Sequence, residues 1–192
     1  GCATWLNQQS LWSRGDDRSF DDYLRGFNAN QRRNIKRERK AVSQAGLTVT
    51  PLTGEQLDLQ LMKSMHGFYE QHCARWGPWG SKYLEERFFE TLAADQRDQV
   101  VLFSAHRGDP HQPVAMSMCV RDQRSLWGRY WGSEEEVDCL HFEVCYYAPI
   151  AWAIEQGLES FDPGAGGSHK RRRGFVARPH ASLHRWYQPQ MD

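Results

Sequence analysis

The sequence predicts one α/β domain built on a mixed, mostly antiparallel central sheet with helices packed against it. Helical spacing dominates the first half of the 192-residue chain, and β-prone segments separated by short polar turns follow it. A long apolar helix and a short strand come next. Strands joined by short turns pair antiparallel, whereas a strand, a helix and a second strand make a crossover with a parallel pair. The order of segments therefore predicts both kinds of pairing in one sheet.

Apolar residues at helical spacing indicate four helices in the first half, at residues 20–27, 31–44, 57–69 and 83–94. Asp21 and Asp22 suit the start of the first helix, and Gly46 suits the end of the second. Five strands are expected, at residues 48–51, 100–105, 114–120, 126–131 and 160–162. A helix at residues 140–158 would connect the last two of them, which predicts the crossover.

Composition limits the classes of function. Lysine plus arginine and aspartate plus glutamate balance at 24 each, so no global field attracts nucleic acid or membrane. Five scattered cysteines favour reduced thiols, and no apolar run approaches the roughly 20 residues of a membrane span. We therefore expect a soluble, cytoplasmic protein. An aromatic segment at residues 5–12 with no element before it predicts that this single domain, residues 1–192, is an excised part of a longer protein.

A glycine-rich and basic segment, residues 161–175, is the most informative stretch. Its glycines allow backbone angles closed to other residues and let a ligand approach the main chain. Free N–H groups backed by cations would suit a phosphate or a developing oxyanion. The alternative is a surface turn followed by a solvated basic run. The candidate ligand-binding residues here are Gly164, Gly166, Gly167, His169, Lys170 and Arg173.

The helix expected at residues 140–158 carries Glu143 within its apolar stripe. A buried carboxylate must be paired, protonated or functional, so Glu143 is either a general base or a structural partner of an arginine such as Arg129. An extended strand would instead gather Cys139, His141, Glu143 and Cys145 as metal ligands. The helical pattern is stronger, and no metal is expected.

Two further charged or polar segments can be interpreted either as solvent-exposed surface or as functional sites. Residues 31–40 carry six cations and one acid, which form either a solvated helix face or a phosphate-binding surface that contains Arg32 and Arg33. The tail holds possible proton-transfer groups or polar surface, namely His180, His184, Trp186 and Tyr187.

Several motifs resemble a family of bacterial proteins assigned as N-acyltransferases and labelled as peptidoglycan biosynthesis or recognition proteins. The motifs cover nearly the whole chain and match the C-terminal half of the family's members. They lie at residues 20–24, 32–39, 128–132, 140–147 and 164–175, the last reading Gly-Ala-x-Gly-x-His-Lys-x-x-Arg-Gly-Phe. The family is related to the Fem-type aminoacyl transferases, and the resemblance implies the fold of the Gcn5-related N-acetyltransferases (GNAT).

The resemblance leaves the acyl donor open. GNAT enzymes bind the pyrophosphate of acyl-CoA in a Gln/Arg-x-x-Gly-x-Gly/Ala loop, but the corresponding residues 132–140 are acidic and lack it. Fem-type relatives also lack this loop and take the aminoacyl group from tRNA. The family usually has His before Trp5, where this chain has Thr4, so no role transfers to that position.

The resulting hypothesis is an N-acyltransferase that moves an acyl or aminoacyl group from acyl-CoA or aminoacyl-tRNA to the amine of a small molecule or peptide. Glu143 or His141 would remove the amine proton, and Tyr146 or Tyr147 would protonate the leaving group. The glycine segment with Lys170 would hold the oxyanion or phosphate. Further phosphate contacts would come from Arg129, Arg173, Arg32 and Arg33. The alternative is a non-catalytic module that binds RNA or a cell-wall precursor.

Overall fold

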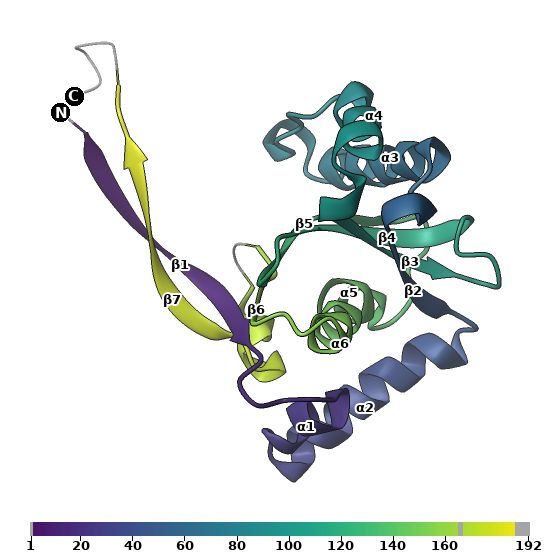
Figure 1. The fold of residues 1–192 in the computed structure, drawn as a ribbon, viewed down its shortest axis with the longest axis vertical. Helices are drawn as coiled ribbons and strands as arrows, with labels where there is room; N and C mark the ends of the chain where they lie inside the picture. Colours follow the sequence, from purple (N-terminus) through teal and green to yellow (C-terminus); the bar gives the residue numbers. More distant parts are fainter. Residues whose placement is uncertain (1, 165–166, 187–192) are drawn as a thin grey trace.

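A seven-stranded sheet organises the fold in this computed structural model, which describes residues 2–164 and 167–186 (Figure 1). Its strands are β1 (Ala3–Ser13), β2 (Thr48–Thr53), β3 (Val100–His106), β4 (Pro113–Arg121), β5 (Ser125–Ser133), β6 (Ser160–Asp162) and β7 (Val176–His184). They lie in the order β2-β3-β4-β5-β6-β1-β7. β5 and β6 pair parallel, and the other neighbouring strands pair antiparallel. The predicted mixed, mostly antiparallel sheet is confirmed.

The helices cover both faces of this sheet. They are α1 (Phe20–Arg25), α2 (Ala29–Gln44), α3 (Leu59–Ala74), α4 (Glu86–Asp95), α5 (Leu140–Phe142) and α6 (Ala148–Glu155). Short 3-10 helices are η1 (Gly54–Gln56), η2 (Gly77–Trp79), η3 (Arg97–Gln99) and η5 (Ser168–Arg173). Ser19, Asn28 and Asp58 precede α1, α2 and α3, and each side chain accepts a backbone N–H of the first turn. Their sequence positions therefore explain where these helices begin.

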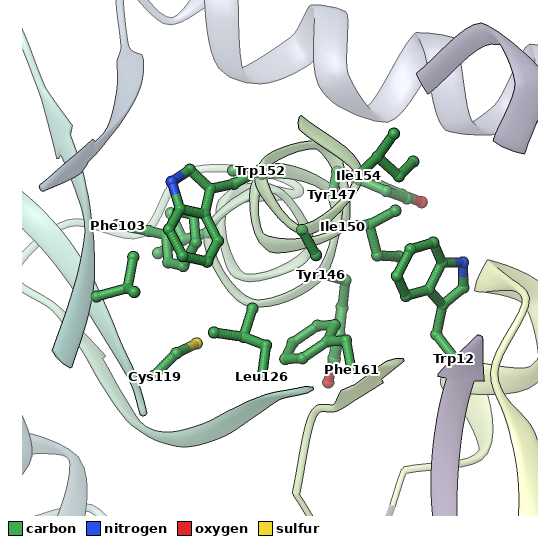
Figure 2. Close-up of a cluster of buried hydrophobic side chains, with 14 of the residues drawn as sticks. Trp12, Phe103, Cys119, Leu126, Tyr146, Tyr147, Ile150, Trp152, Ile154 and Phe161 are labelled. Atoms are coloured by element: carbon green, nitrogen blue, oxygen red, sulfur yellow. The ribbon is translucent and has the colours of Figure 1, made fainter. Parts of the chain in front are cut away.

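Two apolar cores lie on opposite faces of the sheet because the side chains of a strand alternate between faces. Val101 and Phe103 of β3 point into the core that holds α6, whereas Val100 and Leu102 point toward α3 and α4. Figure 2 shows the first core, where Trp12, Phe103 and Phe161 surround the helix that follows β5. In Figure 1 this helix lies within the curve of the sheet, with α1 and α2 on its outer side. The sheet, α2 and this helix thus position one another.

The helix after β5 is interrupted by a π-helical turn, η4 (Glu143–Tyr147), between α5 and α6. Pro149 has no N–H to donate and disfavours the regular ladder. Ala148 N–H instead bonds Glu143 O, five residues back, and the Ser117 hydroxyl of β4 donates to Val144 O at 2.7 Å. The strand thus replaces a bond that the proline removes, which ties η4 to the sheet.

β1 and β7 pair over nine positions and extend away from the rest of the molecule as a two-stranded ribbon (Figure 1). Neither strand was predicted from the sequence. His180 and His184 of the tail lie on β7 and are exposed, and Tyr187 lies outside the described residues. In the described part of the chain, no helix is both long and apolar enough to cross a membrane.

Candidate active site

The candidate active site lies where the parallel strands β5 and β6 separate. Their pairing ends at Trp127 and Asp162. Two residues later, Arg129 has no partner on β4. Met118 pairs with Tyr130 and Cys119 pairs with Gly128, which leaves Arg129 as the extra residue of a bulge. This β-bulge faces the π-helical turn η4. Bulges and π-turns both occur frequently at functional sites, so their meeting marks this position.

A small hollow of about 70 Å³ lies at this point, and we call it the central hollow. It brings together three residues that the sequence analysis named separately, Arg129, His141 and Tyr146. Its other lining residues are Ser117, Met118, Cys119, Gly128, Tyr130, Trp131, Cys145 and Pro163. Burial raises the pKa of the Cys145 thiol well above its ordinary value, so Cys145 stays protonated and makes a poor nucleophile.

His141 is held in the central hollow by aromatic contacts. Its ring centroid lies 4.6 Å from that of Trp131 and 5.9 Å from that of His169. Burial, with smaller contributions from the positive charges of His169 and Arg173, lowers the pKa of His141 to about 4. The imidazole is therefore neutral near pH 7 and has a nitrogen lone pair that can accept a proton.

Tyr146 and His169 form a hydrogen bond between Oη and Nε2 of 2.9 Å. Burial raises the pKa of Tyr146, so the phenol stays protonated. Burial and the charges of Arg173 and Lys170 lower the pKa of His169. A protonated phenol beside a neutral imidazole can give up a proton and be reprotonated by its neighbour.

Lys170 fixes the glycine segment at the end of β6. Its buried Nζ donates to Gly164 O at 2.7 Å, and burial lowers the pKa of this amine while the charge of Asp162 opposes the shift. Gly164 and Gly167 have φ of 87° and 84°, so the backbone angles predicted for them are confirmed. Gly166 lies outside the described residues. Lys170 thus acts on the shape of the segment and does not line the central hollow.

A second polar cluster connects α2 with η5. Glu38 of α2 accepts a hydrogen bond from Tyr147 Oη and one of 2.7 Å from Arg173 Nη2. Arg173 also donates to His169 O at 3.0 Å and lies 3.5 Å above the Phe142 ring. Of the two tyrosines proposed as acid, Tyr146 therefore lies with His141, and Tyr147 lies in this cluster. Glu38 was not predicted as a site residue, because its partners lie 109 and 135 positions away in the sequence.

Glu143 is bound by Arg39 of α2. Arg39 Nε lies 3.1 Å from both carboxylate oxygens, and Nη2 lies 2.9 Å from Oε1. The structural partner suggested from the sequence, Arg129, was wrong, because Arg129 is exposed on the bulge of β5. Glu143 does not line the central hollow. Its carboxylate joins α2 to η4 by a bidentate ion pair.

The cations of the predicted phosphate-binding surface do not all lie in one place. A hollow of about 260 Å³, which we call the basic hollow, lies between α2 and η5 and is lined by Arg37, Arg172 and Arg173 among others. Arg32 instead donates from Nη1 to Phe27 O, and Arg33 is exposed; neither lines this hollow. His169 lines the basic hollow and bonds Tyr146 of the central hollow, so the two hollows adjoin.

A further hollow lies apart from the central and basic hollows, and the residues considered as metal ligands do not form a site. A larger hollow, of about 820 Å³, lies beside β1, β7 and η5 and is lined by Gln8, Ser10 and Arg171 among others. The residues from Leu140 onward are helical, so the strand that would have gathered Cys139 and Cys145 with His141 is not formed. Within residues 2–164 and 167–186, no group of three or more potential metal ligands occurs.

Solved structures with similar folds come from several bacteria. The C-terminal domain of a protein assigned as a lysylphosphatidylglycerol synthetase from Agrobacterium fabrum superposes with a TM-score of 0.65 at 10% identity, covering 95% of this chain and 60% of that one. L-PGS from Bacillus licheniformis gives 0.63 at 9% identity, covering 95% and 61%. A conserved protein of unknown function from Bacteroides thetaiotaomicron gives 0.56 at 11% identity, covering 96% and 62%. The chain therefore spans about three fifths of these neighbours, and the likeness concerns the fold.

No curated protein sequence matches the chain. A sequence profile described as FemAB_like, peptidoglycan biosynthesis/recognition, matches residues 1–192. The match covers the whole chain and agrees with the motifs of the sequence analysis. The chain therefore belongs to the FemAB-like family.

Proposed function

We propose that this domain transfers an aminoacyl group from aminoacyl-tRNA to an amine of a small molecule or peptide in cell-envelope synthesis. Membership of a family described by peptidoglycan biosynthesis supports the pathway. The neighbour from Agrobacterium fabrum carries a name that describes the making of an aminoacylated product, which supports the class of transfer. Direct transfer fits the site, because Cys145 is protonated and offers no thiolate for a covalent intermediate.

The observation that carries this proposal is a neutral His141 beside the Tyr146–His169 hydrogen bond. The amine nitrogen attacks the carbonyl carbon of the aminoacyl ester and loses a proton to His141. The tetrahedral intermediate then collapses: the C–N bond remains, the C–O bond to the ribose breaks, and the departing oxygen takes the proton of Tyr146. The proton on His141 replaces it by way of His169 or solvent, so the enzyme is restored.

The position of acidic residues favours tRNA over CoA as the carrier. The segment between β5 and α5 carries Glu134, Glu136 and Asp138, and all three are exposed. A CoA pyrophosphate placed at this helix start would meet three like charges. Exposed cations lie on α2 and η5, where Arg37 and Arg172 line the basic hollow.

A donor comparison tests the proposal. The domain is incubated with an acceptor amine and, in turn, with radiolabelled aminoacyl-tRNA and radiolabelled acetyl-CoA. We expect label on the amine from aminoacyl-tRNA, and little of it with His141→Asn. The matched control is His111→Asn, since His111 lies at an exposed pair with Asp58. Transfer from acetyl-CoA alone would contradict the assigned donor.

A non-catalytic RNA-binding module is the alternative, and one observation favours it. Arg33, Lys36, Arg37 and Lys40 are exposed along α2, whereas Arg39 is used internally. Cations that contact phosphates make affinity fall steeply with salt. A folded domain that binds tRNA with such a salt dependence but transfers no label from either donor would establish this alternative.

A further inference from the structure

An aromatic hollow adjoins the central hollow on the side of α3. It has a volume of about 330 Å³ and is lined by Tyr69, His72, Cys73, Trp76, Trp79, Gly80, Ser81, Arg129, Tyr130 and Trp131. This volume lies within the range of small-molecule sites. No mechanistic step above uses its tryptophans. Trp76 and Trp79 are 62% and 86% exposed, although burying such rings is strongly favourable.

The loop that carries these tryptophans is held in one place. A Cβ on Gly80 would lie 2.1 Å from the carbonyl oxygen of Cys73, so only glycine lets the loop approach the end of α3 this closely. Tyr69 Oη accepts the N–H of Tyr83 at 2.7 Å and that of Leu84 at 3.1 Å. The exposed rings are therefore presented on a fixed backbone.

The charges around the aromatic hollow select the kind of ligand. Arg129 lines it, and no carboxylate does. The Arg129 side chain makes no hydrogen bond or ion pair within the described parts of the chain. Burial lowers the pKa of His72, with a further contribution from the charge of Arg75. His72 is therefore neutral near pH 7 and adds no charge to the hollow. Aromatic faces with a guanidinium beside them suit a planar ring that carries a negative group, which is the chemistry of a nucleotide.

The shared wall between the two hollows favours one kind of nucleotide donor over another. Arg129, Tyr130 and Trp131 line both the aromatic and the central hollow. A single ligand with its base in the first hollow and its reacting carbonyl at His141 in the second would need these two groups in neighbouring parts of the molecule. In an aminoacyl-tRNA the ester is attached to the ribose of the terminal adenosine, next to the base. In acyl-CoA a long pantetheine arm separates the two.

Resting on the function proposed above, we propose that the aromatic hollow binds the terminal adenosine of the aminoacyl-tRNA. The base stacks on Trp79 and Trp76, and its 5′-phosphate contacts Arg129. The ribose ester then faces the central hollow, where His141 and Tyr146 act. This arrangement makes the hollow a subsite for the donor and leaves the acceptor amine to approach from another side.

Calorimetric titration tests this subsite without any transfer reaction. The probes are 5′-AMP, the trinucleotide CCA, UMP and CoA. We expect 5′-AMP and CCA to bind, and Trp79→Ala to weaken both by about tenfold or more, the size of a lost base–aromatic stack. Trp79→Phe should retain most of the affinity. Trp5→Ala is the matched control, because Trp5 is 62% exposed on β1.

A second variant examines the phosphate contact. Arg129→Ala should weaken 5′-AMP more than adenosine, and it should reduce the salt dependence of CCA binding. Unchanged affinity in both Trp79→Ala and Arg129→Ala would overturn the subsite, as would tighter binding of UMP or CoA than of 5′-AMP. Nucleotide binding that persists while no donor supports transfer would leave the subsite standing and remove the proposed reaction.

Discussion

Tyr146 on the π-helical turn and His169 on η5 share a hydrogen bond of 2.9 Å, although 23 residues separate them. This bond crosses from the central hollow to the basic hollow. It joins the helix after β5 to the segment after β6, the two sides of the opening between the parallel strands. The proposed proton path and the geometry of the opening therefore depend on the same contact.

Removal of the phenol oxygen isolates the role of Tyr146. For Tyr146→Phe we expect the transfer rate to fall about 100-fold or more, the range typical of a lost general acid. Stability should fall by only about 1 kcal/mol, the net value of one hydrogen bond. Single-turnover rates and urea unfolding measure the two effects. A rate within threefold of wild type would exclude Tyr146 as the acid.

Glu143 provides a contrasting case, because its carboxylate is bound by Arg39. For Glu143→Gln we expect a loss of roughly 1 to 3 kcal/mol in unfolding free energy, reduced from the fully buried value because Arg39 is partly exposed. The transfer rate should stay within a few fold. A double-mutant cycle with Arg39→Leu and Glu143→Leu measures the coupling. A folded Glu143→Gln protein that has lost transfer would restore Glu143 as the base.

The pH dependence of stability reports on His141. Its pKa is about 4 when folded, below the ordinary value near 6.5, so between these values the unfolded chain binds more protons. Its contribution is therefore complete above pH 6.5 and is lost as pH falls toward 4, by up to roughly 3 kcal/mol. Urea unfolding at pH 7.5, 5.5 and 4.5 should show a shallower decline in His141→Asn than in wild type. Parallel declines would show that His141 has an ordinary pKa.

The exposed cations of α2 should govern the salt dependence of tRNA binding. Neutralising Arg33, Lys36, Arg37 and Lys40 together should reduce the slope of log K against log salt by up to about 3, from roughly 0.7 per lost single-strand phosphate contact. Filter binding at several salt concentrations measures the slope. The control is Arg25→Gln, which removes a cation from α1. Equal slopes would place the tRNA elsewhere.

Local patterns predicted most of the fold. Residues 140–158 carry an apolar helical stripe and lie between two β-prone segments, so the parallel pairing of β5 with β6 could be inferred. The ribbon of β1 and β7 could not, since its strands are about 170 residues apart and largely exposed, which leaves no buried alternation to detect. The fourth helix was expected from Tyr83 but begins at Glu86, because Tyr83 N–H bonds Tyr69 Oη.

The sequence predicted several residues of the candidate site, but it did not predict which of them contact one another. His141, Tyr146 and Arg129 were each named, and their meeting depends on a bulge and a π-turn that leave little trace in residue order. The partner of Glu143 is a long-range contact across 104 positions, so spacing could not distinguish Arg39 from Arg129. A signal did exist in the lone acid Glu38 within a basic run, since an isolated acid among cations often marks an internal ion pair.

The role of His141 as the base is tested by the single-turnover rate of aminoacyl transfer from tRNA to an amine, compared between His141→Asn and His111→Asn. His111→Asn should match wild type, because His111 is exposed beside Asp58. His141→Asn should remain folded, bind the donor with similar affinity and transfer at least about 100 times more slowly, as expected for a lost general base. Equal rates in the two variants would contradict the assignment of proton removal to His141.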